Sequence, residues 1–405
     1  MNVLMAHNYY GSGAPSGENQ VFELERDLLR KNGHKVDEFL RHSDVIRAKG
    51  PWGVVQGALS TPWNPFAAKT MQRKVKAGQP DVVHVHNTFP LLSPAIFHAI
   101  GHRAARVLTL HNYRLFCSAG IPMRAGRVCT DCLDRRSVLP AIRHACYRGS
   151  HLATLPLAAN VALHRFVGTW TKQVDAFIAL TDFQREEMID AGLPAELVHV
   201  KPNFYPGDPV IVPWEKRNQR VVFAGRLTAE KGVVALVKAW MKWGPTSPEL
   251  YMVGDGDLRG ELERLAATAP DVQIRFLGQI SGVEAQEEIA RARLLVLPSE
   301  WFEGFPMVVQ EAFAFGTPVA ASYIGPLPSI VRNDDNGVVF APGDPASLLK
   351  TVRTSWETEG ELQRLAAGAR ASFEALYTEE ANYRILTDIY EQAIDVSKRR
   401  KKETE

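Results

Sequence analysis

Short apolar runs that lack polar alternation recur along the whole chain and constrain its fold more than any other feature. A strand with one solvated face alternates apolar and polar residues, whereas unbroken apolar runs are typical of parallel strands buried on both faces. Stretches of helix length separate the runs, and this rhythm predicts an α/β protein with parallel sheets. The runs lie at residues 3–6, 82–86, 107–111, 176–180, 221–224, 250–253, 274–277, 294–297, 319–321 and 338–340.

The length of the chain predicts two domains. Its 405 residues exceed the roughly 250–300 at which a single hydrophobic core stops growing. Residues 201–218 hold four prolines and little periodicity, which is typical of an interdomain linker. We therefore expect doubly wound domains at 1–203 and 204–378 and an amphipathic helix at 379–398. The basic end at 398–402 is expected to be disordered.

Positive charge is concentrated in one part of the chain. The net charge is only +2, but residues 45–174 hold 17 Lys and Arg against three Asp, a local balance of +14. Such a field attracts an anionic membrane surface, a pyrophosphate-bearing substrate or a nucleic acid. The alternative is a solvated basic face without a partner.

Aromatic residues accompany this basic stretch, among them Trp52, Trp63 and Phe66, and residues 152–167 are apolar. Basic residues interleaved with aromatic ones favour docking on an anionic membrane, and packing of Trp63 and Phe66 in the core is the alternative. No apolar run approaches the ~20 residues that span a bilayer, and the N-terminus lacks the cationic start of a signal peptide. We expect a cytoplasmic protein, peripherally associated with the inner face of the membrane, and no nucleic-acid partner.

Two loops have the composition of anion sites. A glycine-rich loop at residues 11–18, which includes Gly13 and Gly17, follows the first apolar run and opens a helix whose first N–H groups are free to meet an anion. A plain strand-to-helix turn is the alternative. Gly225, Arg226 and Lys231 follow the run at 221–224, where ligands of open α/β sheets bind. Two cations at this place could neutralise a diphosphate without a metal, whereas salt-bridged surface residues are the alternative.

A third loop carries two carboxylates. Glu303 lies at the start of a predicted helix that continues through Glu311, and Gly304, Phe305 and Pro306 connect it to that helix. This spacing lets one carboxylate reach a sugar ring while the other accepts hydrogen bonds from ribose hydroxyls. A carboxylate is also favoured next to free helical N–H groups, so helix capping is the alternative for Glu303.

Arg226, Lys231, Glu303 and Glu311, in this order and context, resemble the donor site of glycosyltransferase family 4, a retaining group, and the resemblance extends over essentially the whole chain. It implies the GT-B fold, in which two Rossmann-like domains face a central cleft, and a final helix that crosses back onto the first domain. It also implies that Arg226 and Lys231 hold the donor diphosphate, that Glu311 holds the ribose, and that Glu303 contacts or orients the transferred sugar.

Polar residues end two apolar runs of the first domain, where loops build sites. The resemblance places a histidine at the position of His111, near the donor sugar, where it would hydrogen-bond the sugar or the acceptor. His86 and Asn87 would shape the same cleft on the acceptor side. The family often has Asp after this histidine, whereas this chain has Asn112, which speaks against an acid role for that residue.

All four cysteines, Cys117, Cys129, Cys132 and Cys146, lie within 30 residues. Two of them are separated by two residues, a spacing typical of a four-thiolate zinc site that would hold a long loop in place. Some members of the resembled family carry a similar cysteine-rich insertion. Such a zinc would be structural, and buried or free thiols are the alternative.

Together these features predict a metal-independent, retaining hexosyltransferase. The donor would be a UDP- or GDP-sugar, and the acceptor a saccharide or a lipid-linked pyrophosphoryl saccharide in cell-surface polysaccharide or glycan biosynthesis. Cations and helix N-termini would stabilise the departing diphosphate, so no protein nucleophile is required. The alternatives are a sugar-nucleotide epimerase on the same fold and a non-catalytic protein that binds anionic glycan or nucleic acid.

Overall fold

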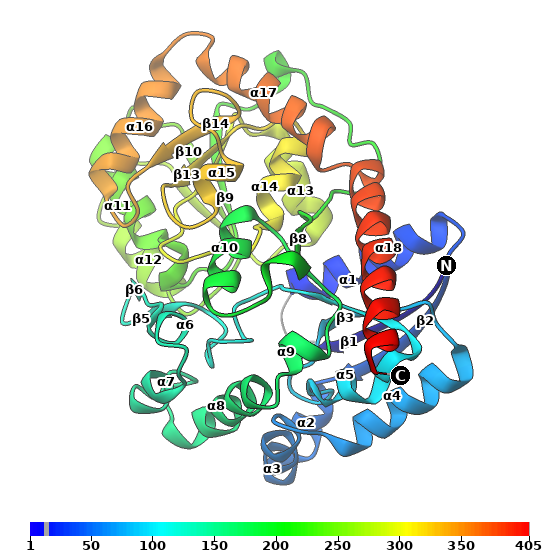
Figure 1. Cartoon of the computed structure of the whole chain (residues 1–405). Coiled ribbons are helices and arrows are strands. Elements are labelled where there is room, and N and C mark those ends of the chain that lie inside the picture. The colour runs from blue at the N-terminus through cyan, green and yellow to red at the C-terminus, as the bar shows by residue number, and fades with distance from the viewer. Residues whose placement is uncertain (12–15, 405) are drawn as a thin grey trace. The chain divides into compact units, whose positions relative to one another are not determined.

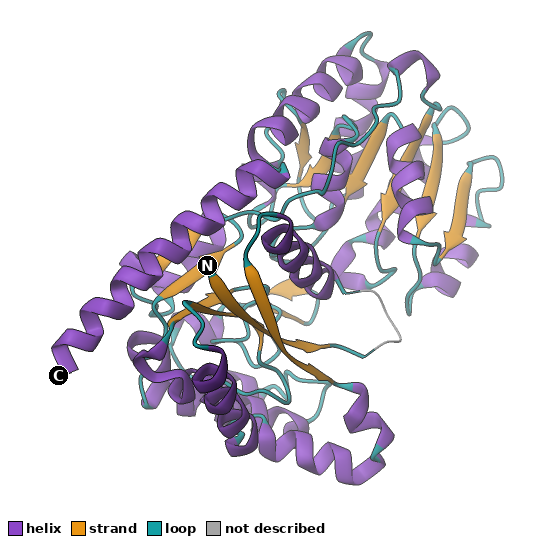
Figure 2. Cartoon of the chain, turned by 90° about the vertical axis from the view of Figure 1, so that its right-hand side faces the viewer, coloured by secondary structure: helices purple, strands orange, loops and turns teal. Residues whose placement is uncertain are grey.

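The computed structural model describes residues 1–11 and 16–404, and the chain forms two compact units (Figure 1). The first unit comprises Met1–Pro122, Thr130–Pro202 and Asn382–Glu405. The second comprises Met123–Cys129 and Asn203–Ala381. In each unit, helices lie on both faces of a six-stranded sheet (Figure 2).

The first sheet is entirely parallel and has the strand order β2-β1-β3-β4-β7-β8. Its strands are β1 (Asn2–Tyr9), β2 (Lys35–His42), β3 (Val82–Asn87), β4 (Ala105–Thr109), β7 (Ala176–Ala179) and β8 (Val198–Val200). The helices of this unit are α1 (Gly17–Lys31), α2 (Asp44–Ala48), α3 (Gly50–Ser60), α4 (Pro65–Gly78), α5 (Ala95–Ile100), α6 (Asp131–Asp134), α7 (Leu139–Arg143), α8 (His151–Phe166), α9 (Thr169–Lys172), α10 (Asp182–Asp190) and α18 (Glu379–Thr404).

The second sheet is also parallel, with the order β11-β10-β9-β12-β13-β14 that is typical of dinucleotide-binding folds. Its strands are β9 (Arg220–Ala224), β10 (Glu249–Val253), β11 (Ile274–Gly278), β12 (Leu294–Leu297), β13 (Val319–Ser322) and β14 (Gly337–Phe340). The helices are α11 (Val233–Trp243), α12 (Arg259–Ala266), α13 (Gly282–Arg291), α14 (Met307–Ala314), α15 (Leu327–Ile330), α16 (Pro345–Glu357) and α17 (Glu361–Leu376). A small antiparallel hairpin pairs β5 (Met123–Arg124) with β6 (Arg127–Val128).

The ten apolar runs all fall on strands of these two sheets, and parallel pairing buries them as expected. Every residue of β3, β4, β7, β12 and β13 is buried. The prediction missed β2 and β8, which form the two edges of the first sheet. The predicted run at 107–111 also extends past β4, whose last residue is Thr109.

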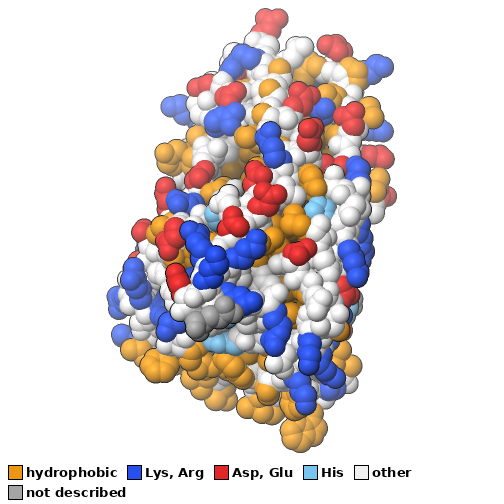
Figure 3. Space-filling view, turned by 45° about the vertical axis from the view of Figure 1, so that its right-hand side comes forward, with side chains coloured by type: hydrophobic (Ala, Val, Ile, Leu, Met, Phe, Trp, Pro, Cys, Tyr) orange, Lys and Arg blue, Asp and Glu red, His pale blue; other side chains and the backbone are white. Residues whose placement is uncertain are grey.

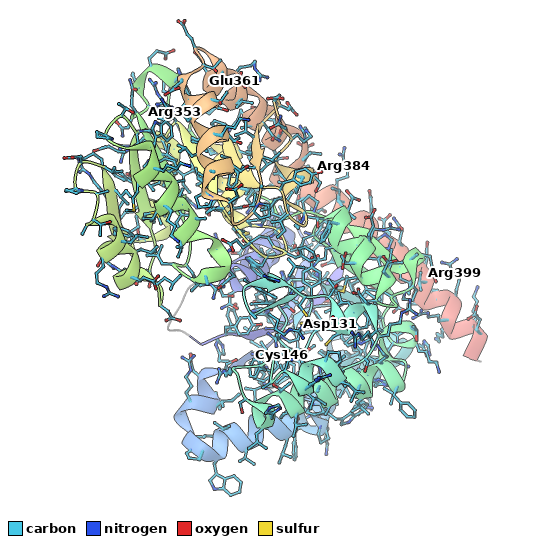
Figure 4. The ribbon with its side chains drawn as sticks, turned by 90° about the vertical axis from the view of Figure 1, so that its left-hand side faces the viewer. Asp131, Cys146, Arg353, Glu361, Arg384 and Arg399 are labelled. Atoms are coloured by element: carbon cyan, nitrogen blue, oxygen red, sulfur yellow. The ribbon has the colours of Figure 1, made fainter. Side chains whose placement is uncertain are left out.

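The C-terminal helix α18 belongs to the first unit. Leu386, Ile389, Tyr390 and Ala393 join the core formed by β1, β3, β4, β7 and α1, while Arg384 and Arg399 are exposed along the helix (Figure 4). The expectation of a disordered basic end was wrong, because α18 continues to Thr404.

An ion pair explains why the basic end is helical. The Arg400 guanidinium donates to the Val174 carbonyl oxygen at 2.8 Å and lies 3.1 Å from the carboxylate of Asp175. Asp175 is itself buried and also pairs with the buried Arg106 at 2.9 Å. The end of α18 is therefore fixed to the residues that directly precede β7.

Replacing Leu386 by Ala tests this role of α18. Because Leu386 is fully buried, the substitution leaves a cavity and should lower the free energy of unfolding by about 2–5 kcal/mol. Asp388→Ala, on the exposed side of the same helix, should change it little. Urea unfolding of both variants measures the difference, and equal midpoints for the two would contradict the assignment of α18 to this core.

Candidate active site

The candidate residues of the second unit follow the two strands at the middle of its sheet. From β9 the chain proceeds outward through β10 and β11, then returns to place β12 on the other side of β9. Ligands of open α/β sheets bind at such a reversal, beyond the carboxyl ends of the strands. Arg226 and Lys231 come after β9, and Glu303 comes after β12.

A close backbone contact joins the two loops. Gly232 has a φ of +66°, and a Cβ atom there would lie 1.8 Å from the carbonyl oxygen of Pro298. Only glycine satisfies both conditions. In addition, the N–H of Glu300 donates to the carbonyl oxygen of Glu230 at 2.9 Å. The turn that carries Lys231 is thereby held against the end of β12.

Three donors converge on one oxygen of Glu303. The ammonium of Lys231 lies 2.7 Å from Oε1, the hydroxyl of Ser299 donates to it at 2.6 Å, and the indole N–H of Trp301 donates at 3.1 Å. Both members of the Lys231–Glu303 ion pair are largely buried. Glu303 does not cap a helix, since the N-cap of α14 is Pro306.

The other two predicted donor residues are oriented differently. The side chain of Arg226 is 57% exposed and pairs with Glu230 at 3.0 Å. Glu311, on α14, accepts a hydrogen bond from the side-chain amide of Gln286 at 3.2 Å. Burial raises the pKa of Glu311, and the bond from Gln286 opposes this effect. The connecting residues Gly304, Phe305 and Pro306 run from Glu303 to α14, with Phe305 and Pro306 buried. Gly225 directly follows β9.

In the first unit, a chain of buried histidines lies at the ends of β3 and β4. Nδ1 of His86 and Nε2 of His111 are 3.0 Å apart, and the two rings are stacked. His84 hydrogen-bonds with the hydroxyls of Tyr390 and Thr109, both at 2.8 Å. His86 and His111 also line a cavity of about 50 Å³ together with Asn87 and Asn112, so the predicted catalytic histidine and the three predicted acceptor-side residues meet there.

Burial keeps these imidazoles neutral. It lowers the pKa of His84 to about 3, with a smaller contribution from the nearby ammonium of Lys201. Burial, followed by the neighbouring histidines, lowers the pKa values of His86 and His111 well below 6.5. A charged imidazolium acid at His111 is therefore not part of this site at neutral pH.

The two amides hold the backbone of the loops around this cavity. The amide N–H of Asn87 donates to the Asn8 carbonyl oxygen at 2.9 Å, and its oxygen accepts from the N–H of Phe89 at 2.8 Å. The oxygen of Asn112 accepts from the N–H of Arg114 at 2.9 Å. Gly17 is the first residue of α1, and Gly13 lies outside the described residues.

Sequence reasoning missed the charged pair beneath the histidines. The carboxylate of Glu25 is 2.5 Å from the ammonium of Lys201, and its second oxygen is 3.6 Å from Nε2 of His86. The signal was present, because Glu25 interrupts the apolar stripe that Phe22 and Leu29 form on α1. Glu18 was also missed as a titrating group, and burial raises its pKa to about 8.

Metal-ligand clustering does not single out the cysteines. Across the described residues, the one group of three potential ligands within 4.8 Å of one another is Glu25, His84 and His86. Its carboxylate charge is already balanced by Lys201.

The four cysteines of the predicted zinc site differ in burial. Cys117 and Cys132 are buried, Cys129 and Cys146 are half-buried, and the thiol of Cys117 donates to the Ile121 carbonyl oxygen at 3.6 Å. Cys146 and Asp131 lie in the segment between β4 and α8 (Figure 4). Zinc binding there stays a prediction.

The neutral histidines predict how stability depends on pH. As the pH falls below 6.5, the unfolded chain takes up protons that the buried His84, His86 and His111 cannot, so the free energy of unfolding should decrease. Each group contributes about 1.4 kcal/mol per pH unit between its unfolded and folded pKa values. Denaturant unfolding at pH values from 7 down to 5.5 measures the slope.

A matched pair of variants separates the buried histidines from the rest. His84→Asn should reduce the slope by up to about 1.4 kcal/mol per pH unit, the share of one histidine. The remaining slope comes from the other histidines whose pKa values burial lowers, which include His7 and His164, both at about 4. His102→Gln, at an exposed position, should leave the slope unchanged. If the free energy of unfolding of the unsubstituted protein does not change between pH 7 and 5.5, the buried histidines take up protons in the folded state as they do in the unfolded chain.

Comparison with known proteins identifies the family. Residues 17–206 match the family described as glycosyltransferase family 4, and residues 208–372 match glycosyl transferases group 1. The chain is 30% identical over 237 residues to glycogen synthase of Mycobacterium tuberculosis, covering 56% of each chain. It is 26% identical over 239 residues to the amylovoran biosynthesis glycosyltransferase AmsK of Erwinia amylovora, covering 54% of this chain and 57% of that one. The matches thus span little more than half the length of these relatives.

A solved structure has the same fold over its full length. The crystal structure of HepE from Anabaena, in complex with UDP and glucose, superposes with a TM-score of 0.64. The match covers 96% of this chain and 99% of HepE at 20% sequence identity. The two parallel-sheet α/β domains are those of the GT-B fold, and the two matched regions together span both of them. The chain belongs to glycosyltransferase family 4, the group 1 glycosyltransferases.

Proposed function

We propose that this chain transfers a sugar, with retention of anomeric configuration, from a UDP- or GDP-sugar to a saccharide or lipid-linked saccharide acceptor. The observation that carries the proposal is the joined pair of loops after β9 and β12, which holds Lys231 against Glu303 and leaves Arg226 exposed at the reversal of strand order. The relatives named for glycogen and amylovoran synthesis, and the UDP bound by HepE, support this class of donor and a role in polysaccharide assembly.

In this reaction the second unit stabilises the negative charge of the departing diphosphate. When the bond to the sugar breaks, negative charge develops on the diphosphate, and preorganised cations lower the barrier most. Lys231 is preorganised because Glu303 fixes its ammonium. Arg226 is exposed, and among the described residues its charged partner is Glu230. If it leaves Glu230, its planar guanidinium can turn onto phosphate oxygens. These two charges suit a reaction in which no metal is required.

The carboxylates fit binding better than covalent catalysis. Oε1 of Glu303 already accepts from three donors, which stabilises its negative charge and weakens it as a nucleophile. We assign Glu303 to orienting Lys231 and the sugar, and Glu311 to the ribose hydroxyls. The acceptor hydroxyl then attacks from the face that the diphosphate leaves, and a phosphate oxygen takes its proton. His111 contributes a neutral hydrogen bond to a hydroxyl.

A donor screen tests the proposal. We expect one UDP- or GDP-sugar to raise the thermal unfolding temperature of the unsubstituted protein and to be slowly hydrolysed. Arg226→Ala and Glu311→Ala should abolish both effects, while Arg275→Ala, which removes an exposed cation paired with Glu249 elsewhere in the same unit, should change neither. Conversion of the donor alone into an isomeric nucleotide sugar would indicate an epimerase, and stabilisation without any turnover would indicate a binding protein.

The ion pair gives a second, quantitative prediction. Lys231→Ala removes charge stabilisation from the leaving group and leaves Glu303 buried without its cation, so we expect kcat for sugar transfer or donor hydrolysis to fall roughly a hundredfold or more. Glu303→Gln keeps the hydrogen bonds from Ser299 and Trp301 but releases the ammonium, and should retain donor binding while kcat falls. Initial rates measured over a range of donor concentrations up to saturation separate the change in kcat from any change in donor binding. An unchanged kcat in both variants would remove the pair from the mechanism.

A further inference from the structure

The first unit exposes large apolar side chains on three neighbouring helices. We call this set the apolar face: Trp52 and Leu59 of α3, Phe66 of α4, and Leu152, Leu155 and Phe166 of α8. Phe66 is 81% exposed and Phe166 is 90% exposed, so the alternative that Phe66 packs in the core was wrong. Trp63 is 39% exposed.

The spacing of these residues makes the outer sides of two helices apolar. In α3, the exposed Val55 and Leu59 lie three and seven positions after the exposed Trp52, which places all three on one side of the helix. The helix contains no charged residue. In α8, Leu152, Leu155 and Phe166 recur at offsets of three and fourteen. A helix at the surface of a water-soluble domain normally turns a polar side outward. Here the solvent-facing stripe is apolar.

Contacts between the helices make the face continuous. The ring of Trp63, between α3 and α4, stacks on His164 of α8 with centroids 5.6 Å apart, and Nε2 of His164 donates to the Pro62 carbonyl oxygen at 2.8 Å. Hydrophobic side chains gather at the lower end of the molecule in Figure 3, where Figure 1 places α2, α3 and α8. An exposed apolar area of this kind marks an interaction site.

Basic residues continue the face along α4. Phe66, Lys69, Arg73 and Lys76 recur at helical spacing on its exposed side. Within the described part of the chain, neither Lys69 nor Arg73 has a carboxylate partner. Residues 45–174 contain only three acidic side chains. The side of α4 that borders the apolar face is therefore basic, since α4 contains no acidic residue.

We infer that the apolar face docks on a bilayer that contains anionic phospholipid. Aromatic and leucine side chains beside uncompensated Lys and Arg match the boundary between acyl chains and anionic headgroups. A protein partner would be expected to meet an interface whose charges are mixed at the rim, whereas the border along α4 carries only basic charges. In the described part of the chain, no helix is long and apolar enough to cross a bilayer. The helices α3 and α8 therefore lie along the surface and insert their exposed side chains.

Vesicle flotation of the full chain tests the inference. We expect strong binding to vesicles of phosphatidylcholine mixed with phosphatidylglycerol, weak binding to phosphatidylcholine alone, and weaker binding as salt increases. Trp52→Ser with Phe66→Ser should lower the vesicle affinity roughly tenfold or more. Lys69→Glu with Arg73→Glu should lower it by at least about tenfold for the mixed vesicles only.

Matched controls lie on the second unit. Val210→Ser and Val283→Ser remove exposed apolar side chains there, and Lys242→Glu reverses an exposed charge, so none should change vesicle binding. Donor hydrolysis in solution should be the same for the Trp52 and Phe66 variants as for the unsubstituted protein, which shows that they fold and separates this inference from the proposed function. Binding that is absent, or equal in all variants, would overturn the inference. Loss of self-association in the Trp52 and Phe66 variants without any vesicle binding would assign the face to a second copy of the chain instead.

Discussion

The direction of the parallel strands is the constraint from which both candidate sites follow. Because all six strands of each sheet run the same way, their carboxyl ends share one edge, and the loops with chemistry-bearing side chains must gather there. In the second unit the reversal between β9 and β12 brings Lys231 to Glu303, although 72 residues separate them in the chain. In the first unit the same geometry brings His86, at the end of β3, to His111, just after β4. The two loops approach so closely that Gly232 has no room for a side chain next to the carbonyl oxygen of Pro298.

Most of the buried charges in the described residues are compensated in pairs, and each pair joins distant parts of the chain. Arg217 is the exception, since its guanidinium donates to carbonyl oxygens and to the Thr317 hydroxyl. The ion pair between Lys201 and Glu25 joins the residue after β8 to α1. The ion pair between Arg106 and Asp175 joins the start of β4 to the residue before β7, and Arg400 of the C-terminal helix also contacts Asp175. Burying a charge costs several kcal/mol unless a partner is present, so such pairs are poor sources of net stability but strong determinants of geometry. The Lys231–Glu303 pair differs because it lies at a sheet edge beside an exposed arginine. A pair that a phosphate can join is suited to binding, whereas the enclosed pairs are structural.

The sequence predicted the repeating features of the fold and missed those that depend on tertiary partners. Runs buried on both faces, such as 294–297, are recognisable because every residue is apolar. The edge strand β2 is mostly polar and has no regular alternation, so it was overlooked. The composition of 398–402 predicted disorder, since nothing local shows that Arg400 meets a buried carboxylate. Candidate donor residues could be named because glycine, cations and carboxylates follow the apolar runs in the order seen in the resembled family. The contact of Glu25 with Lys201 spans 176 residues, so its partner could not be named from the sequence.

Among the described residues of the first unit, the carboxyl end of the sheet carries neutral histidines together with two arginines, Arg47 beside Gly11 and Arg114. That edge carries His86 and His111, which burial keeps neutral, and the nearby Arg114 lies over the ring of Phe89, 4.5 Å from its centroid. The excess cations instead lie on exposed helical sides such as that of α4. The second unit has a net negative charge but places Arg226 and Lys231 at the strand reversal. A compact diphosphate needs a few cations at fixed positions, whereas a lipid surface is met by many mobile ones. The distribution of charge therefore argues for two different anionic partners, one for each unit.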